Sequence, residues 1–180
     1  SLQGQDSGTP DAVDFEEHFT QAPEPRVDLL WVIDDTGSMA EEHAALADAF
    51  GTFAAALSTA GLAWQMGVTT TDVTRADAGQ LRGDPWILTP ALPDTVSAMR
   101  EAASVGTDGS EPSSGLGAAW LALSDPLATS ENRGFRRAEA GLHVVVVSDG
   151  DDAGDEILGF DTATAMAALL DDAAATSGQP

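Results

Sequence analysis

The sequence predicts a three-layer α/β domain, in which a mainly parallel sheet is covered by helices on both faces. Two short apolar runs rich in β-branched residues, 27–33 and 142–147, are typical of strands buried on both faces. Segments with the apolar period of amphipathic helices lie between the expected strands. This alternation indicates parallel pairing, because parallel neighbours are joined by crossover helices.

We expect residues 1–25, rich in Gly, Gln, Pro, Asp and Glu, to form a flexible acidic tail or linker. The organised domain should occupy residues 26–180. After the first strand, Ser38 with Glu41 three residues later predicts a capping box at the start of a helix. Gly61 is the expected C-terminal cap of that helix. Its apolar stripe consists of Leu46, Phe50, Phe53 and Leu57.

The rest of the chain continues the alternation. A second strand is expected at 63–70, and a weaker third strand at 85–89, where Pro85 indicates an edge position. Helices are expected at 93–104 and 114–123, before the strand at 142–147. An acidic loop then leads to a final helix capped by Asp161.

Composition excludes several classes of partner and chemistry. The chain has 7 basic residues, all Arg, against 30 acidic ones, and its net charge is −23. Such a charge argues against nucleic acid or an anionic membrane as the main partner. The apolar runs are too short to span a bilayer, so no membrane insertion is expected. Without Cys there is no disulfide or thiolate chemistry. The three His residues are too scattered to predict a zinc site, and His43 is expected to be exposed.

Oxygen-bearing side chains follow the first strand directly. Asp34, Thr36 and Ser38 occupy positions i, i+2 and i+4 of one tight loop. In open α/β sheets, ligands gather at this carboxyl end of the strands. Three oxygens aimed at one point suit Mg²⁺, Mn²⁺ or Ca²⁺. Because hydroxyls are neutral, a cation held by them would keep positive charge and attract a carboxylate from elsewhere.

Two further segments offer oxygens to the same edge of the sheet. Asp149 follows the strand at 142–147, so it lies beside Asp34 if the two strands are neighbours. The loop that precedes the helix at 114–123 carries Thr107, Ser110 and Glu111.

Together these residues resemble the metal-ion-dependent adhesion site of von Willebrand factor type A domains, in particular bacterial secreted or lipoprotein members. That family carries Asp-x-Ser/Thr-x-Ser after its first strand, a Thr in a later loop, and an Asp after its fourth strand. Asp34, Thr36 and Ser38 match the first motif, and Asp149 matches the last position. The resemblance covers about residues 27–170.

The loop position is less well defined. Thr107 is the best match, but its loop departs from the usual Gly-Gly-Thr-x-Thr form, so Ser110 stays an alternative and Glu111 a weaker one. The family sheet has six strands and this sequence supplies about four. The resemblance therefore implies that the last strands are absent or come from another segment or chain.

The resemblance also implies a function. The hydroxyls of Thr36, Ser38 and Thr107 would contact the cation, and Asp34 and Asp149 would act directly or through water. An acidic residue of a partner protein would take the open coordination position. The cation would be Mg²⁺, with Ca²⁺ or Mn²⁺ as alternatives. The domain would bind rather than catalyse, in adhesion or the assembly of a surface complex. Its location would be extracellular, cell-surface or periplasmic, although residues 1–10 hold no signal segment.

Three other interpretations stay open. The string 35–38, Asp-Thr-Gly-Ser, also occurs in aspartic proteases, but that chemistry needs a second carboxylate and the chain has no second copy. The motif could instead be only a turn and a helix cap in a metal-free structural module. The acidic loop at 151–156 fails the EF-hand pattern, and is either a secondary Ca²⁺ site or a solvated loop.

Overall fold

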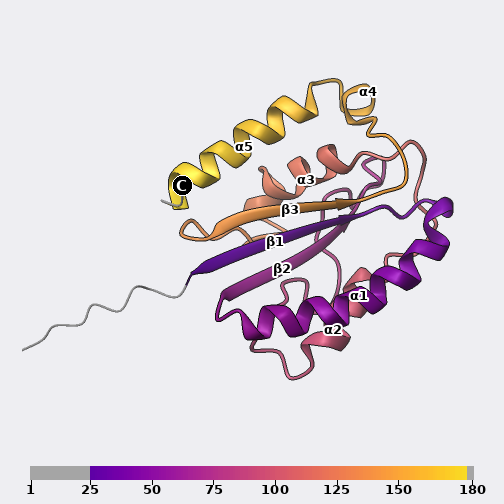
Figure 1. Cartoon of the computed structure of the whole chain (residues 1–180). Coiled ribbons are helices and arrows are strands. Elements are labelled where there is room, and N and C mark those ends of the chain that lie inside the picture. The colour runs from indigo at the N-terminus through magenta and orange to yellow at the C-terminus, as the bar shows by residue number, and fades with distance from the viewer. Residues whose placement is uncertain (1–24, 178–180) are drawn as a thin grey trace, which may run out of the picture.

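Three parallel strands form the central sheet of the computed structural model, which describes residues 25–177 (Figure 1). They are β1 (Arg26–Ile33), β2 (Ala63–Thr70) and β3 (Gly141–Val147), in the order β2-β1-β3. Ile33 pairs with Thr70 on one side and with Val147 on the other, so the three strands end level with one another. The residues that follow them therefore leave the sheet at one common edge.

Helices cover both faces of the sheet, as predicted (Figure 1). Helices α1 and α2 pack on one face, and α3 and α5 on the other. The helices are α1 (Ala40–Thr59), α2 (Thr95–Ala103), α3 (Gly115–Leu123), α4 (Gly154–Leu158) and α5 (Thr162–Ser177), with the 3-10 helices η1 (Gly37–Met39) and η2 (Leu127–Thr129). Within residues 25–177 no helix has the length and hydropathy to cross a membrane.

The central strand β1 divides the core into two layers. Its side chains alternate between the faces, so Leu29 and Ile33 pack under α1 and α2, while Leu30 and Val32 pack under α3 and α5. All four are less than a tenth exposed. This two-sided burial explains why β1 is almost continuously apolar, and it fixes the direction in which the following residues leave the sheet.

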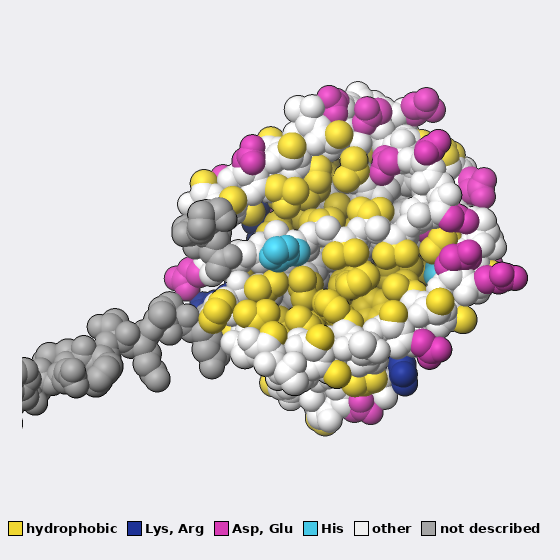
Figure 2. All heavy atoms as spheres, in the orientation of Figure 1, with side chains coloured by type: hydrophobic (Ala, Val, Ile, Leu, Met, Phe, Trp, Pro, Cys, Tyr) yellow, Lys and Arg dark blue, Asp and Glu magenta, His cyan; other side chains and the backbone are white. Residues whose placement is uncertain are grey.

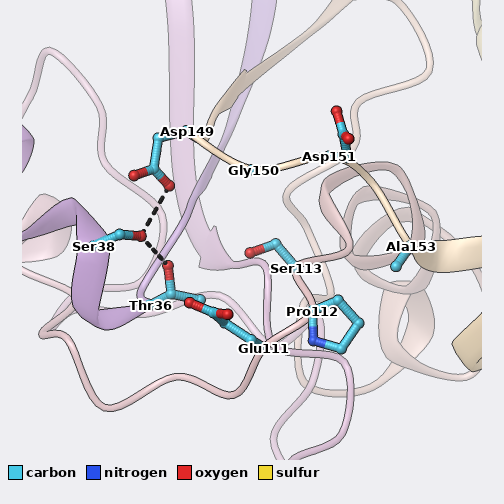
Figure 3. Close-up of a pocket in the computed structure, with 9 residues that line it drawn as sticks. All are labelled: Thr36, Ser38, Glu111, Pro112, Ser113, Asp149, Gly150, Asp151 and Ala153. Carbon is cyan, nitrogen blue, oxygen red and sulfur yellow. Dashed lines mark hydrogen bonds between the residues drawn. The ribbon is translucent and has the colours of Figure 1, made fainter.

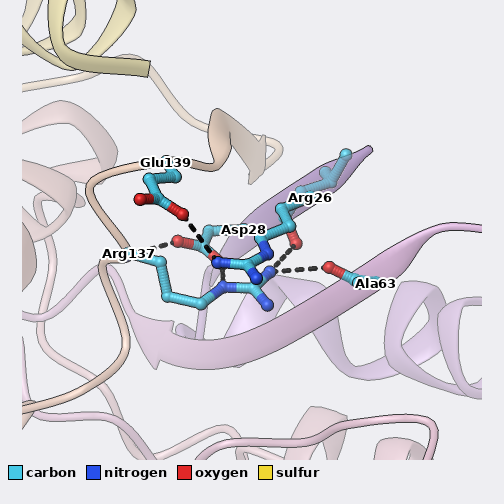
Figure 4. Close-up of polar contacts among 6 residues, drawn as sticks. Arg26, Asp28, Ala63, Arg137 and Glu139 are labelled. Carbon is cyan, nitrogen blue, oxygen red and sulfur yellow. Dashed lines mark hydrogen bonds and ion pairs between the residues drawn. The ribbon is translucent and has the colours of Figure 1, made fainter. Parts of the chain in front are cut away.

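A buried ion pair fastens the opposite, amino-terminal end of the sheet (Figure 4). Asp28 of β1 is 1% exposed and accepts hydrogen bonds from the backbone N–H and Nε of Arg137, both at 2.7 Å. The Arg137 guanidinium also donates to the carbonyls of Val27 and Ala63, at 3.0 and 2.8 Å. Burial raises the pKa of Asp28 above its usual value, although the Arg137 contacts oppose the shift. One arginine thus joins β1, β2 and the segment that leads into β3.

Two expectations about elements are corrected, and one falls outside the described residues. The strand expected at 85–89 is reduced to a single antiparallel bridge between Leu88 and Met66, so the described sheet has three strands rather than four. Within the loop expected after β3, residues 154–158 form α4. The tail expected at 1–25 lies outside the described residues except for Pro25, whose carbonyl accepts from Ala63 N–H at 3.0 Å.

Candidate metal centre

A chain of hydrogen-bonded oxygens crosses from β1 to β3 at the carboxyl edge of the sheet (Figure 3). The hydroxyls of Thr36 and Ser38 lie 3.1 Å apart, and Ser38 donates to Asp149 Oδ1 at 3.0 Å. Because Ser38 has one hydroxyl proton, the Thr36 hydroxyl is then the donor to Ser38 Oγ. Thr36 is buried, whereas Ser38 and Asp149 are exposed. The chain of oxygens therefore runs from the interior to the surface.

Ser38 holds this place because the local structure differs from the predicted capping box. A turn of 3-10 helix, η1, precedes α1, which begins at Ala40 with Met39 at its N-cap position. No side chain caps either helix at its N-terminus, so the interpretation of Ser38 as the N-cap was wrong. Its hydroxyl is directed to Asp149 instead.

Asp34 lies behind this chain and is fully buried. Its Oδ1 accepts from Thr36 N–H at 2.9 Å, and its Oδ2 accepts from the hydroxyls of Ser113, at 2.7 Å, and Ser148. Burial acts to raise the pKa of Asp34, but the donors on Ser148, Thr36 and Ser113 outweigh it and hold the pKa below its ordinary value. Asp34 is thus a negative charge bound by its own chain, and it ties β1 to the loop before α3 and to the end of β3.

The oxygens of Thr36, Ser38 and Asp149 line a cavity of about 440 Å³ that opens to solvent. Figure 3 shows the carboxylate of Glu111 pointing toward Thr36, whereas that of Asp151 points away from the Thr36–Ser38 pair. The lining residues are Thr36, Ser38, Glu111, Pro112, Ser113, Asp149, Gly150, Asp151 and Ala153. Carboxylates and hydroxyls therefore dominate the polar groups of the cavity.

Two of the loop residues expected as ligands, Thr107 and Ser110, lie outside this cavity, whereas the weaker alternative, Glu111, lines it. Thr107 and Ser110 are exposed and are not among its lining residues. The backbone N–H of Ser110 donates to Asp72 Oδ2 at 2.9 Å. This bond holds the loop against Asp72, which lies two residues after the end of β2. Ser113, three residues after Ser110, lines the cavity, and its hydroxyl donates to Asp34 Oδ2 at 2.7 Å. Only its position immediately before the helix at 114–123 could have indicated this contact.

His43 contributes a contact that the sequence did not predict. It is half-buried on α1 rather than exposed, and its Nε2 lies 2.6 Å from the backbone carbonyl oxygen of Asp34. Because a carbonyl only accepts, Nε2 carries the proton and donates. The first helix therefore holds the backbone of the site loop through a side chain on its first turn.

Asp35 does not have the access that an aspartic protease needs. Its side chain is 3% exposed, and a Cβ on Gly109 would lie 2.4 Å from Asp35 Oδ1, so the loop covers it closely. That oxygen has no hydrogen-bond partner among the described residues. Burial, the largest cause, raises the pKa of Asp35, and the negative charge of Asp72 acts in the same direction. A catalytic dyad must contact substrate, and this carboxyl faces the interior.

The acidic loop after β3 uses two of its carboxylates as backbone caps. Asp152 accepts from the N–H groups of Leu116 and Gly154, at 2.7 and 2.8 Å. Asp155 accepts from the N–H and hydroxyl of Thr162, both at 2.7 Å. These bonds favour a structural role for the loop over a secondary Ca²⁺ site.

The donor set around the cavity fits a hard cation held partly by hydroxyls. In residues 25–177 no three or more His, Asp or Glu side chains gather as a metal cluster, so hydroxyls would have to share the ligation with Asp149. Neighbouring oxygens of an octahedral Mg²⁺ lie about 2.9 Å apart, given Mg–O bonds of about 2.0–2.1 Å. The hydrogen bonds that join Thr36, Ser38 and Asp149, at 3.1 and 3.0 Å, hold these oxygens close to that spacing. No protein-family model matches the chain, and no curated protein matches it.

Proposed function

We propose that this chain is a divalent-cation-dependent protein-binding domain, of the kind formed by von Willebrand factor type A domains. The observation that carries the proposal is the oxygen chain of Thr36, Ser38 and Asp149 on the wall of a solvent-open cavity. Mg²⁺ suits these ligands best, because it binds oxygen and retains several exchangeable waters. Ca²⁺ and Mn²⁺ are the alternatives.

Each residue would have a separate role. The hydroxyls of Thr36 and Ser38 and the carboxylate of Asp149 would hold the cation. Asp34, whose two oxygens already accept from the chain's own donors, would fix the loop and supply negative charge behind the site. Ser113, which lines the cavity and contacts Asp34, would take the role expected of Thr107 or Ser110.

The charges around the cavity make partner binding depend on the cation. Glu111, Asp149 and Asp151 all line it, so a partner's carboxylate would be repelled when no cation is present. A cation held by two neutral hydroxyls and one carboxylate keeps positive charge and would attract that same carboxylate. The partner is therefore proposed to be a protein that presents an Asp or Glu. Such a domain would act in adhesion or surface-complex assembly, outside the cell or at its surface.

Calorimetric titration of the metal-stripped chain with MgCl₂, MnCl₂ or CaCl₂ at constant ionic strength tests the cation site. We expect one saturable site, and at least tenfold weaker binding in Asp149→Asn. The matched control is Asp48→Asn, which removes one negative charge from an exposed position on α1. If the cation affinity fell equally in both variants, the loss would come from the lower overall negative charge. That result would contradict the proposal.

Peptide selection tests the partner chemistry. Random peptides selected on the immobilised chain in Mg²⁺ should be enriched in Asp or Glu, and EDTA should release them. Selection of basic peptides, or binding that EDTA does not reverse, would contradict an acidic partner group.

A further inference from the structure

Glu111 is an unpaired carboxylate on the wall of the candidate metal centre. Its side chain is exposed and lines the cavity, and Figure 3 shows its carboxylate directed toward Thr36. Within residues 25–177 this carboxylate has no hydrogen-bond or ion-pair partner. No basic residue belongs to the described lining of the cavity. Nothing in the described part of the chain therefore neutralises this charge.

The loop that carries Glu111 is fastened on both sides of it. Before Glu111, the backbone N–H of Ser110 donates to Asp72 Oδ2 at 2.9 Å. After it, the Ser113 hydroxyl donates to Asp34 Oδ2 at 2.7 Å. These bonds hold the backbone of Glu111 beside the cavity, so rotation of its side chain is what would carry the carboxylate to or from the oxygen chain.

The three acidic residues of the cavity differ in what they face. Asp149 accepts from Ser38 and belongs to the oxygen chain. Asp151 is exposed, and its carboxylate points away from Thr36 and Ser38. Glu111 points toward Thr36 and has no partner in the described chain. Carboxylates that face one cavity repel each other unless a cation lies between them, so the direction of Glu111 favours a cation as its partner.

We propose that Glu111 is an internal, displaceable ligand of the cation in the partner-free domain. This inference rests on the cation site proposed above and specifies how that site is regulated. With the carboxylates of Asp149 and Glu111 both bound, a divalent cation keeps no net charge and attracts a further carboxylate only weakly. A partner's Asp or Glu would take the coordination position that Glu111 leaves, where the positive charge is again available.

Displacement would make the site selective among carboxylates. Because Glu111 belongs to the same chain, it meets the cation at an effective concentration in about the millimolar range. A partner carboxylate has the same chemistry, so it would replace Glu111 only when further contacts around the cavity add to its affinity. The apparent affinity for an isolated carboxylate is reduced by the fraction of domains in which Glu111 has left the cation. Glu111 would thus strengthen cation binding and weaken the binding of isolated carboxylates.

The test measures the binding of Mn²⁺ and of acetate, an isolated carboxylate, to the full chain. Calorimetry gives the affinity for Mn²⁺, and the relaxation rate of water protons reports the exchangeable water on the bound ion. In Glu111→Gln we expect the Mn²⁺ affinity to fall about tenfold, because affinity follows the number of charged ligands. Water relaxation should rise, since water takes the vacated position. Acetate added at saturating Mn²⁺ should lower that relaxation at about a tenfold lower concentration than in the parent.

Two further variants separate ligation from charge. Asp151→Asn removes one negative charge from the same cavity, at a carboxylate that points away from the oxygen chain, and should leave water relaxation unchanged. Glu111→Asp keeps the charge but shortens the side chain by one methylene, and should behave as Glu111→Gln does. Since Glu111 is exposed and has no partner among the described residues, neither substitution removes a contact that holds the described fold.

Three results would overturn the proposal and leave the cation site in place. They are no change in Glu111→Gln, equal changes in Glu111→Gln and Asp151→Asn, or a Glu111→Asp variant that behaves as the parent. The last two would assign Glu111 an effect of charge alone. Absence of saturable Mn²⁺ binding in the parent, or binding that Asp149→Asn does not weaken, would overturn the proposed function and this inference together.

Discussion

The Asp34 carboxylate receives donors on both of its oxygens, and this limits what it can do at the site. Thr36 N–H, Ser113 and Ser148 together hold it in one orientation. A carboxylate so occupied is suited to fixing the loop, while the exposed Asp149, whose Oδ1 accepts from Ser38, is suited to binding a cation. The two acids would therefore have different roles at the proposed site, although the motif alone treats them alike.

Asp72 provides a test of stability against pH. Burial opposes its ionisation, but donors on Thr74 and Ser110 outweigh burial and hold its pKa below the ordinary value. Since the folded pKa is the lower one, this contribution to stability is complete above the unfolded pKa and is lost as the pH falls through the folded pKa. Urea unfolding between pH 7 and pH 3 should therefore show a shallower acid loss in Asp72→Asn than in the parent. If the free energy of unfolding fell equally with pH in the parent and in Asp72→Asn, the role given to Asp72 would be contradicted.

At the scale of elements, the amino-terminal end of the sheet depends on one half-buried arginine, Arg137. The Arg137 side chain is 24% exposed and bonds to Asp28 and to carbonyls in β1 and β2, so it joins segments that are distant in the sequence. The Arg136–Asp172 pair lies at 2.9 Å but is more exposed, at 30% and 73%. The two neighbouring arginines thus form a matched comparison of a buried and an exposed ion pair.

We predict that Arg137→Met lowers the free energy of unfolding by about 3 kcal/mol, because it leaves the buried Asp28 charge unpaired. The control Arg136→Met should cost less than about 1 kcal/mol, since exposed pairs contribute little. Urea denaturation of both variants measures the difference. Equal losses of unfolding free energy in the two variants would contradict a larger contribution from the Asp28–Arg137 pair.

The elements that sequence predicted well are those defined by local pattern. The apolar stripe that includes Phe50 and Leu57 correctly predicted α1, and the apolar run that ends before Ser148 correctly predicted β3. Asp161 caps α5 as expected, accepting from Thr164 N–H at 2.8 Å. The strand predicted at 85–89 was wrong, because Leu88 is the one residue of that range that pairs with β2.

The site was predicted in part, for a physical reason. Asp34, Thr36 and Ser38 follow one strand, and Asp149 follows its neighbour, so the topology alone brings them together. Ser113 reaches Asp34 across 79 positions, through the path of the loop before α3. No local spacing encodes that path, and the sequence therefore pointed to Thr107 and Ser110, which do not line the cavity, rather than to Ser113, which does.

At the scale of the whole molecule, an excess of negative charge surrounds an ordinary α/β core. The net charge of −23 is spread over a chain with 7 arginines and no lysine, and several arginines are already in ion pairs. Repulsion between exposed carboxylates opposes the compact state and is screened by salt. The candidate cation site lies where acidic residues gather at the carboxyl edge of the sheet.

We predict that the melting temperature rises between 0.05 and 1 M NaCl, because the Debye length shortens to about 3 Å at 1 M. Each kcal/mol gained should raise it by about 2–4 °C for a chain of this size. Calorimetry in NaCl and in KCl separates screening from specific ion binding, since screening is equal in both. A melting temperature independent of salt would contradict the importance given to charge repulsion.

The most direct test of the central claim is thermal melting of the metal-stripped chain during titration with Mg²⁺, Mn²⁺ and Ca²⁺ at 0.5 M NaCl, beside Asp34→Ala and Asp48→Asn. A ligand that binds only the folded state adds about 2.7 kcal/mol at a hundred times its dissociation constant. We predict a saturable rise in the parent and in Asp48→Asn that is absent in Asp34→Ala. A rise of equal size in all three proteins, or none at millimolar cation, would contradict a cation site at Thr36, Ser38 and Asp149.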